Sequence, residues 1–325
     1  MLILKIRSLF ADIRLAIRET MSSEIRKDYI QDKYVIIAPQ RGVRSKETTP
    51  ECQPKPVPPP CRFCPEKINV EPSVFAIKEK NAWSIKVVGN KFPAVSVENQ
   101  KAYGIQEVVV ETPQHGKHLE ELADHHVANL LSVYAARTRA ISKDKKIEYI
   151  LIFKNAGGPA GASIQHAHSQ IFATKFLPPH LLDKSQKVQA YKLRTGHCVY
   201  CDVIGKERKS PRLVFEDKNV VCFTPYASMH NYELWILPKR HLDNVTLLSE
   251  TERLSWAKIL KHALKKIAAL NLPYNFYFHQ VIDDEDQHLY MKITPRGSIW
   301  AGVEIGSGLI INPVSPEDAA KYYRQ

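Results

Sequence analysis

The stretch EVVVETPQH at residues 107–115 has a counterpart, ELWILPKRH, at residues 233–241. In each stretch, an apolar run typical of a β-strand leads through a proline to a histidine. The first glutamate and the final histidine are eight positions apart in both, from 107 to 115 and from 233 to 241. This likeness indicates that the chain contains one structural unit twice.

The sequence around the two stretches repeats as well. Each copy contains, in order, a C-x-x-C pair, the strand that leads to a histidine, a helical pattern, a second apolar strand and an extended segment with another histidine. These landmarks are 61–64, 107–115, 119–142, 149–153 and His166 in the first copy, and 198–201, 233–241, 247–270, 274–278 and His288 in the second. The repeated order predicts a duplication with its boundary near Lys184 to Gly196.

The fold class follows from the way these elements alternate. Strands linked by turns, with a single long helix in each copy, favour an α+β fold over a doubly wound sheet. We therefore predict two antiparallel-sheet units, each with a long helix, at residues 22–185 and 186–325. Residues 1–21 are interpreted as an N-terminal extension or as the product of a start codon misassigned ahead of Met21.

Composition and charge limit the classes of protein. Of the 325 residues, 44% are apolar and 25% are charged, which is typical of a globular protein. The formal net charge of +12 indicates an anionic partner. Because the basic residues are dispersed and form no ladder with aromatic residues, we do not expect nucleic acid to be that partner. No apolar run approaches the roughly 20 residues that span a bilayer, so we expect a cytoplasmic protein without a membrane partner.

The chemistry is concentrated in the segment NAGGPAGASIQHAHSQ at residues 155–170. In an extended chain alternate side chains share a face, so His166, His168 and Gln170 are expected to project to the same side. The glycines before them let the backbone approach a phosphate closely and offer it N–H donors. This combination predicts a site for phosphoryl chemistry.

His168 is the predicted nucleophile. A neutral imidazole nitrogen can attack phosphorus without first losing a proton, and the resulting phosphoramidate donates its phosphoryl group readily to an acceptor. Gln170 is predicted to hydrogen-bond the transferred group.

The spacing of cysteines and histidines predicts two zinc sites. Each copy supplies two cysteines and two histidines, a set that closes a tetrahedral shell and leaves no open position, so both zinc ions are expected to be structural. The predicted ligands are Cys61, Cys64, His115 and His166 in the first copy, and Cys198, Cys201, His241 and His288 in the second.

The motif H-x-H-x-Q beside the strand at 149–153 resembles the histidine-triad superfamily. Residues from about Glu24 to Pro313 are similar to its galactose-1-phosphate uridylyltransferase branch. The resemblance implies a duplicated histidine-triad-like fold, a homodimer, and transfer of UMP between UDP-glucose and galactose 1-phosphate through a nucleotidyl-histidine. It also implies substrate-binding roles for nucleotide-contacting Arg41, Arg44 and Asn90, for phosphate-contacting Asn155, Ser163 and Gln170, and for hexose-contacting Glu304.

The motif departs from the branch's best-known members at two positions. They carry His-Pro-His-Gly-Gln where this chain has His-Ala-His-Ser-Gln at residues 166–170, a form that also resembles adenylyl-transferring relatives such as ADP-glucose phosphorylases. An adenylyl transferase or phosphorylase that acts on ADP-glucose or a dinucleoside polyphosphate is therefore the enzymatic alternative. A hydrolase and a zinc-containing nucleotide-binding module are the further alternatives.

The second copy lacks the nucleophile. Alignment of the copies places Tyr290 opposite His168 and Lys292 opposite Gln170. We interpret the second copy as a degenerate unit that keeps its metal ligands and contributes residues to a sugar pocket.

Overall fold

A computed structural model describes residues 22–43 and 61–325 of the chain. The predicted extension at 1–21 and the substrate-binding prediction at Arg44 lie outside the described residues.

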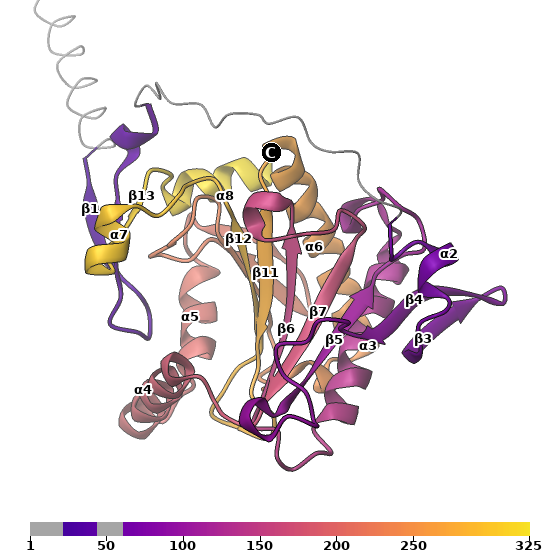
Figure 1. Cartoon of the computed structure of the whole chain (residues 1–325). Coiled ribbons are helices and arrows are strands. Elements are labelled where there is room, and N and C mark those ends of the chain that lie inside the picture. The colour runs from indigo at the N-terminus through magenta and orange to yellow at the C-terminus, as the bar shows by residue number, and fades with distance from the viewer. Residues whose placement is uncertain (1–21, 44–60) are drawn as a thin grey trace, which may run out of the picture.

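One ten-stranded sheet runs through the body of the molecule (Figure 1). Every pair of neighbouring strands in it is antiparallel. Its strands in spatial order are β3 (Ser73–Glu79), β4 (Ala82–Gly89), β5 (Gly104–Val110), β7 (His168–Thr174), β6 (Tyr149–Ala156), β11 (Tyr274–His279), β12 (Tyr290–Pro295), β10 (Leu234–Pro238), β9 (Val220–Phe223) and β8 (Leu213–Glu216).

The duplication is visible in the order of the strands. The sequence β3-β4-β5-β7-β6 in the first half is matched, read from the other edge, by β8-β9-β10-β12-β11 in the second. The halves meet where β6 pairs with β11, so the two predicted sheets form one continuous sheet. The prediction of an α+β fold with two antiparallel units is confirmed.

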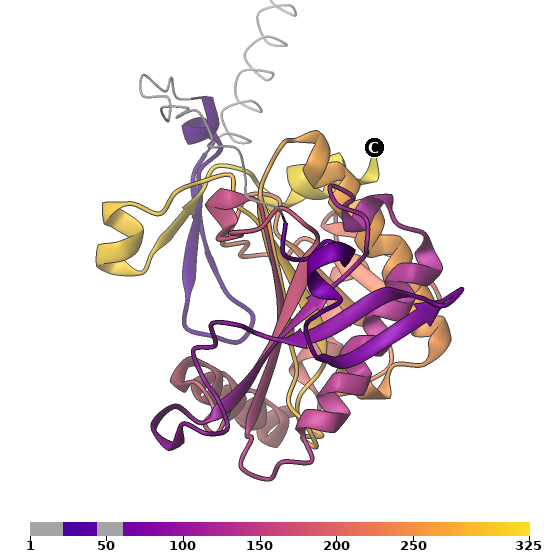
Figure 2. The ribbon, with the colours of Figure 1, turned by 45° about the vertical axis from the view of Figure 1, so that its right-hand side comes forward.

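The two long helices, α3 (Asp124–Ile141) and α6 (Glu250–Ala269), pack side by side on one face of the sheet (Figures 1 and 2). Each begins later than the helical pattern predicted, because a short 3₁₀ turn precedes it, η3 (Leu119–Glu121) and η5 (Val245–Leu247). At α6, Ser249 and Glu252 form a capping box that fixes the start of the helix. The helices and the sheet enclose the main apolar core.

Two further helices, α4 (Pro179–Thr195) and α5 (Val199–Glu207), cover the other face of the sheet in the second half (Figure 2). The boundary predicted near Lys184 to Gly196 thus falls largely inside a helix. Val188 of α4 packs in a cluster with Trp235 and Tyr290 of the second half, so α4 belongs structurally to that half.

A projecting part of the molecule, called the arm below, lies on the side away from β3 and β4 (Figures 1 and 2). Its three-stranded sheet joins both ends of the described chain, with β13 parallel to β2. The arm consists of β1 (Glu24–Lys27), β2 (Tyr34–Ile37), η1 (Pro39–Val43), α7 (Gly302–Ser307) and β13 (Ile310–Asn312). The helices α2 (Pro65–Ile68) and α8 (Pro316–Arg324) lie outside the arm, and none of the described helices has the length and apolarity needed to cross a membrane.

The sheet register corrects the alignment of the two copies by one residue. Val108 stands opposite Gln170, and Trp235 stands opposite Lys292. Glu233 is therefore the counterpart of Gln106 and not of Glu107. The shift arises because the loop to the first metal-ligand histidine, from Val110 to His115, is one residue longer than the loop from Leu237 to His241.

Candidate active site

His168 is the first residue of β7, and its ring lies on the sheet face opposite to α3. The alternation of side chains along the strand sends Ser169 to the other face, where its hydroxyl meets that of Tyr134 in α3 at 2.6 Å. His168 and Gln170 thus share the open face, as the sequence predicted.

The hydrogen bond of the His168 ring determines which nitrogen can react. Its Nδ1 lies 2.8 Å from the carbonyl oxygen of His166, and a carbonyl can only accept, so Nδ1 carries the proton. In the neutral ring Nε2 then holds the free lone pair. Burial lowers the pKa of His168, which favours this neutral form.

Gln170 is held by its oxygen. Its Oε1 accepts hydrogen bonds from Nε2 of Gln106 at 3.1 Å and from Nδ2 of Asn90 at 3.3 Å. Within the described chain its amide nitrogen has no side-chain acceptor, so the two N–H groups remain available to a ligand. Gln106 was not predicted as a site residue, because an isolated glutamine in a strand carries no sequence signal.

A cavity of about 520 Å³ opens over His168 and Gln170. The Phe63 ring forms one wall, with its centroid 5.1 Å from that of His168. The Arg62 guanidinium and the Phe92 ring also line the cavity, with the guanidinium 5.6 Å from the centre of the ring. Of the predicted site residues, this cavity brings together Asn90, Ser163, His168 and Gln170.

The glycine-rich loop lies beside the cavity, between β6 and β7. Gly157 has a φ of +87°, and a Cβ there would lie 2.8 Å from Cβ of Pro273, so only glycine fits. Asn155 stands at the base of this loop and accepts a hydrogen bond from Asn275 of the second half at 2.8 Å. The structure places Asn155 beside the loop but not among the residues that line the cavity.

The first predicted metal-ligand set gathers directly next to His168. The ligand atoms of Cys61, Cys64, His115 and His166 lie within 4.8 Å of one another. The His166 ring turns Nδ1 toward the sulfur atoms, at 3.7 and 3.8 Å, and donates from Nε2 to the carbonyl of Thr112 at 2.7 Å.

The second set gathers in the same way in the other half. Cys198, Cys201, His241 and His288 also lie within 4.8 Å of one another. Both rings turn Nδ1 toward Cys201 and donate from Nε2 to backbone carbonyls, His241 to Glu285 and His288 to Pro238, each at 3.0 Å.

These geometries fit zinc. Two thiol and two imidazole donors suit a closed tetrahedral site, and three of the four rings have their second nitrogen fixed on a carbonyl, which sets the tautomer that a metal needs. Both predicted ligand sets are therefore brought together and can bind a metal ion.

Two predicted substrate-binding residues lie elsewhere. Arg41 is in η1 and Glu304 in α7, both on the arm, on the opposite side of the molecule from the β3–β4 hairpin (Figure 1). A hydrogen bond from the Ala301 N–H lowers the pKa of Glu304, and the Arg41 charge contributes to the same effect. Neither residue lines the cavity over His168 within this chain.

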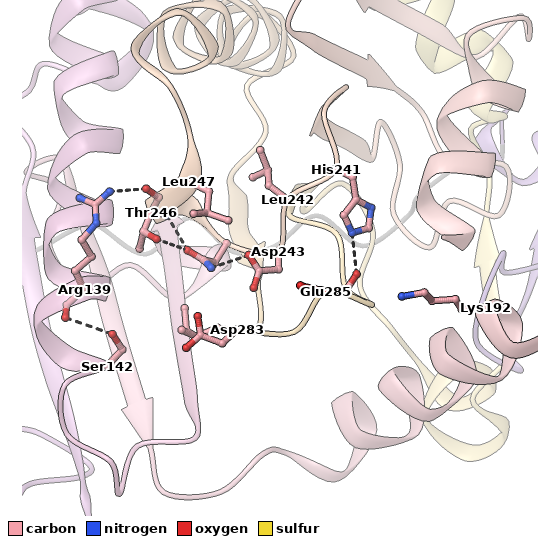
Figure 3. Close-up of a pocket in the computed structure, with 12 residues that line it drawn as sticks. Arg139, Ser142, Lys192, His241, Leu242, Asp243, Thr246, Leu247, Asp283 and Glu285 are labelled. Atoms are coloured by element: carbon pink, nitrogen blue, oxygen red, sulfur yellow. Dashed lines mark hydrogen bonds between the residues drawn. The ribbon is translucent and has the colours of Figure 1, made fainter. Parts of the chain in front are cut away.

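A second cavity, of about 690 Å³, lies beside the second metal-ligand set (Figure 3). Its charged groups include Arg139, Lys192, Asp243 and Glu285. Arg139 donates to the carbonyl of Thr246, and both oxygens of Asp243 accept local hydrogen bonds. The residues that line this cavity do not include Tyr290, the counterpart of His168.

Comparison with known proteins identifies relatives of both halves. Residues 90–178 match the family model of the galactose-1-phosphate uridyl transferase N-terminal domain, and residues 197–298 match a model described as scavenger mRNA decapping enzyme C-term binding.

Relatives of more than 30% identity include two enzymes. ADP-glucose phosphorylase of Arabidopsis thaliana is 33% identical, with 94% of each chain covered. Galactose-1-phosphate uridylyltransferase of Thermotoga maritima is 32% identical, with 70% of this chain and 75% of the relative covered.

Solved structures agree with these relationships. The Arabidopsis ADP-glucose phosphorylase with bound ADP-glucose superposes with a TM-score of 0.83 at 31% identity, covering 94% of this chain and 99% of that one. A structure described as a uridylyltransferase gives a TM-score of 0.72 at 26% identity, covering 93% and 97%. With its fold, its H-x-H-x-Q strand and these relationships, the chain belongs to the galactose-1-phosphate uridylyltransferase family of nucleotidyltransferases.

Proposed function

We propose that this enzyme transfers a nucleotidyl group from a nucleoside diphosphate hexose through a covalent bond to His168. The observation that carries the proposal is the hydrogen bond from His168 Nδ1 to the His166 carbonyl, since it leaves the lone pair of Nε2 free at the wall of the cavity.

In the first step Nε2 of His168 attacks the α-phosphorus of the nucleotide sugar. A bond from nitrogen to phosphorus forms, the bond from that phosphorus to the bridging oxygen breaks, and the sugar 1-phosphate leaves with the electron pair. In the second step an oxygen of the acceptor phosphate attacks the same phosphorus and His168 leaves as the neutral ring.

The surrounding residues stabilise the charge that develops on the transferred phosphate. The amide N–H groups of Gln170 would donate to its oxygens, with Asn90 and Gln106 holding the amide in that orientation. Ser163 and the N–H groups of the glycine loop would add further donors. Zinc in the closed first site would fix His166, and with it the carbonyl that orients the His168 ring.

ADP-glucose is the donor we propose first, with inorganic phosphate as acceptor. The full-length similarity to ADP-glucose phosphorylase supports this choice, and so does the His-Ala-His-Ser-Gln form of the motif. Transfer of AMP from His168 to phosphate would then release ADP. This revises the preference for a uridylyl group that the sequence resemblance implied.

Exchange of UMP between UDP-glucose and galactose 1-phosphate is the second candidate. It is supported by the match of residues 90–178 to the uridyl transferase model and by the Thermotoga relative. The same histidine mechanism serves both candidates, so they differ only in the base and the acceptor.

A homodimer would bring Arg41 and Glu304 to a catalytic cavity. Both lie on the arm, whose Ile25 and Ile305 side chains are 66% and 77% exposed. We propose that the arm reaches the cavity of a second copy, where Arg41 would contact the nucleotide and Glu304 the hexose.

Intact-mass spectrometry tests the proposed function. The protein is incubated separately with ADP-glucose, UDP-glucose and diadenosine tetraphosphate, without acceptor. We expect an added mass of AMP from ADP-glucose, removed again by phosphate with release of ADP. An added mass of UMP from UDP-glucose alone would instead assign the second candidate, and no adduct from any donor would refute the covalent mechanism.

A further inference from the structure

A buried ion pair lies beneath the strand that carries the nucleophile. Nζ of Lys154 is 2.7 Å from Oε2 of Glu111, and the two side chains are only 4% and 0% exposed. Lys154 is on β6 and Glu111 directly follows β5, the two strands that flank β7. Ile152, two residues before Lys154 on the same face, packs in the main core with α3. The pair is therefore on the other face of the sheet from the His168 ring.

Lys154 also contacts His168 itself. Its Nζ donates a second hydrogen bond, of 3.0 Å, to the His168 carbonyl oxygen. The pairing of β6 with β7 ends at Phe153 and Gln170, so no residue of β6 stands opposite His168. The ammonium group satisfies a buried carbonyl where the strand pairing has stopped.

Glu111, which follows β5, is also hydrogen-bonded to the segment just before His168. Its N–H donates to the carbonyl of Ala167 at 3.1 Å, and its own carbonyl accepts from Nε2 of His126 at 2.7 Å. Its second carboxylate oxygen, Oε1, has no hydrogen-bond partner among the described residues. Lys154 is thus the group that compensates the buried charge of Glu111.

The second half lacks this arrangement. In the second half, β11 and β12 remain paired as far as His279 and Tyr290. At the equivalent position of the first half, β6 and β7 are no longer paired. Since Phe153 pairs with Gln170 and Tyr277 with Lys292, the counterpart of Lys154 is Phe278, which is fully buried in the core. The buried pair occurs in the half that has the nucleophile.

We propose that Lys154 and Glu111 are positioning residues for His168. By holding the His168 carbonyl from below, the pair fixes the backbone from which the ring donates Nδ1–H to His166, and so keeps Nε2 directed into the cavity. The inference rests on the proposed function, because it assumes that His168 is the nucleophile. Neither residue contacts the substrate.

The test compares variants that separate positioning from stability. Lys154→Met leaves Glu111 buried without a partner and is expected to be unstable, whereas Lys154→Met combined with Glu111→Leu removes both charges and is expected to fold. Lys154→Arg keeps the charge. The matched control is Glu107→Leu with Arg137→Met, which removes a buried ion pair anchored on the same face of β5 but away from His168.

The measurement is the single-turnover rate of adduct formation with ADP-glucose, or with UDP-glucose if that donor loads the parent. At saturating donor, we expect the Lys154/Glu111 double variant to be about 10- to 100-fold slower, with the donor concentration for half-maximal rate nearly unchanged. Lys154→Arg should recover part of the rate, and the control should stay within about twofold of the parent.

Two results would overturn the inference. One is a double variant that melts near the parent and forms the adduct at the parental rate; the other is a control that is slowed as much as the double variant. A parent that forms no adduct from either donor would refute the proposed function and this inference together, so the two failures can be told apart.

Discussion

The strands β7 and β12 occupy equivalent places in the two halves, yet one carries the proposed nucleophile and the other does not. Each follows a metal-ligand histidine, His166 or His288, whose Nε2 donates to a backbone carbonyl. Two residues further on, His168 faces a cavity, while Tyr290 is buried and stacks on Trp235 with ring centroids 4.6 Å apart. The same set of two cysteines and two histidines thus occurs in both halves, while the counterpart of His168 is a buried tyrosine.

The difference extends to the residues around the two positions. The third residue of each C-x-x-C is aromatic and packs on the ring of the equivalent position. The ring centroids of Phe63 and His168 are 5.1 Å apart, and those of Tyr200 and Tyr290 are 5.5 Å apart. Where Gln106 holds Gln170 in the first half, Glu233 pairs with Lys292 at 2.8 Å in the second. The first half therefore offers the uncharged amide of Gln170 to a ligand, whereas in the second half Glu233 and Lys292 neutralise each other.

Lys184 of α4 fills the space in the second half. Its Nζ donates to the Tyr290 hydroxyl and lies 4.6 Å from the centre of that ring, with Tyr200 and Trp235 completing an aromatic enclosure. The amine of Lys184 thus lies over Tyr290, whereas the equivalent residue of the first half, His168, lines a cavity.

The largest expected effect comes from the nucleophile. Replacing His168 with Asn should lower nucleotidyl transfer by about 10⁴-fold or more, because no other group can form the covalent bond. Zinc content and melting temperature should stay near those of the parent. Transfer at the parental rate in a steady-state assay of the variant would contradict the assignment.

The next comparison uses the equivalent positions Gln170 and Lys292. Gln170→Ala should slow adduct formation by about 10²-fold or more, since it removes donors to the developing charge. Lys292→Met should instead destabilise the fold by about 3–5 kcal/mol, because it leaves Glu233 buried and unpaired. Parallel rate measurements and denaturant titrations of both variants test this contrast, which fails if the two substitutions have the same effect.

Substitutions in the two predicted metal sites are expected to have effects of intermediate size. Metal analysis of the parent should approach two zinc ions per chain. Cys198→Ser should remove about one zinc and lower stability while adduct formation persists, whereas Cys61→Ser should remove one zinc and also slow the adduct, because His166 is then released. Equal effects of the two substitutions on the adduct would show that the halves do not differ in this way.

The smallest expected effect is a change in the pH dependence of stability. Burial lowers the pKa of Lys184 to about 7, below its ordinary value of 10.5. Between these values the unfolded chain binds more protons, so this group makes the fold more stable as pH rises from 7 toward 10, by at most about 1.4 kcal/mol per pH unit. In Lys184→Met this contribution should vanish. Melting curves of both proteins at pH 7 and pH 9 test it, and an unchanged difference between the two pH values would contradict it.

Much of this structure could be predicted from the sequence because the repeat fixes the order of landmarks. The two metal-ligand sets and the face shared by His168 and Gln170 follow from spacing and from the alternation of a strand. The one-residue offset could not be predicted, because both copies place a glutamate eight residues before the histidine while their loops differ in length. The burial of Lys154 and Glu111 could not be predicted either, because a charged residue in an apolar strand is equally compatible with an exposed position.

The predicted substrate-binding residues fall into two groups, those that line the cavity and those that lie on the arm. Asn90, Ser163 and Gln170 line the cavity: Gln170 is in β7, Ser163 is in the loop before it, and Asn90 directly follows β4. Arg41 and Glu304 were inferred from the resemblance, as Asn90 and Ser163 were, but a resemblance assigns a role to a residue without saying where in the folded chain it lies. Their place on the arm is a property of the folded chain that motif spacing does not contain.

The most direct test of the difference between the halves is to locate the covalent adduct. The protein is loaded with the nucleotide sugar that gives a mass increment, digested at a pH that preserves phosphoramidates, and mapped by tandem mass spectrometry. We predict one nucleotidyl group per chain, on the peptide that contains His168, and none on the peptide that contains His288 and Tyr290. An adduct on any other residue, or a loaded protein whose His168 peptide is unmodified, would contradict the assignment of the chemistry to the first half.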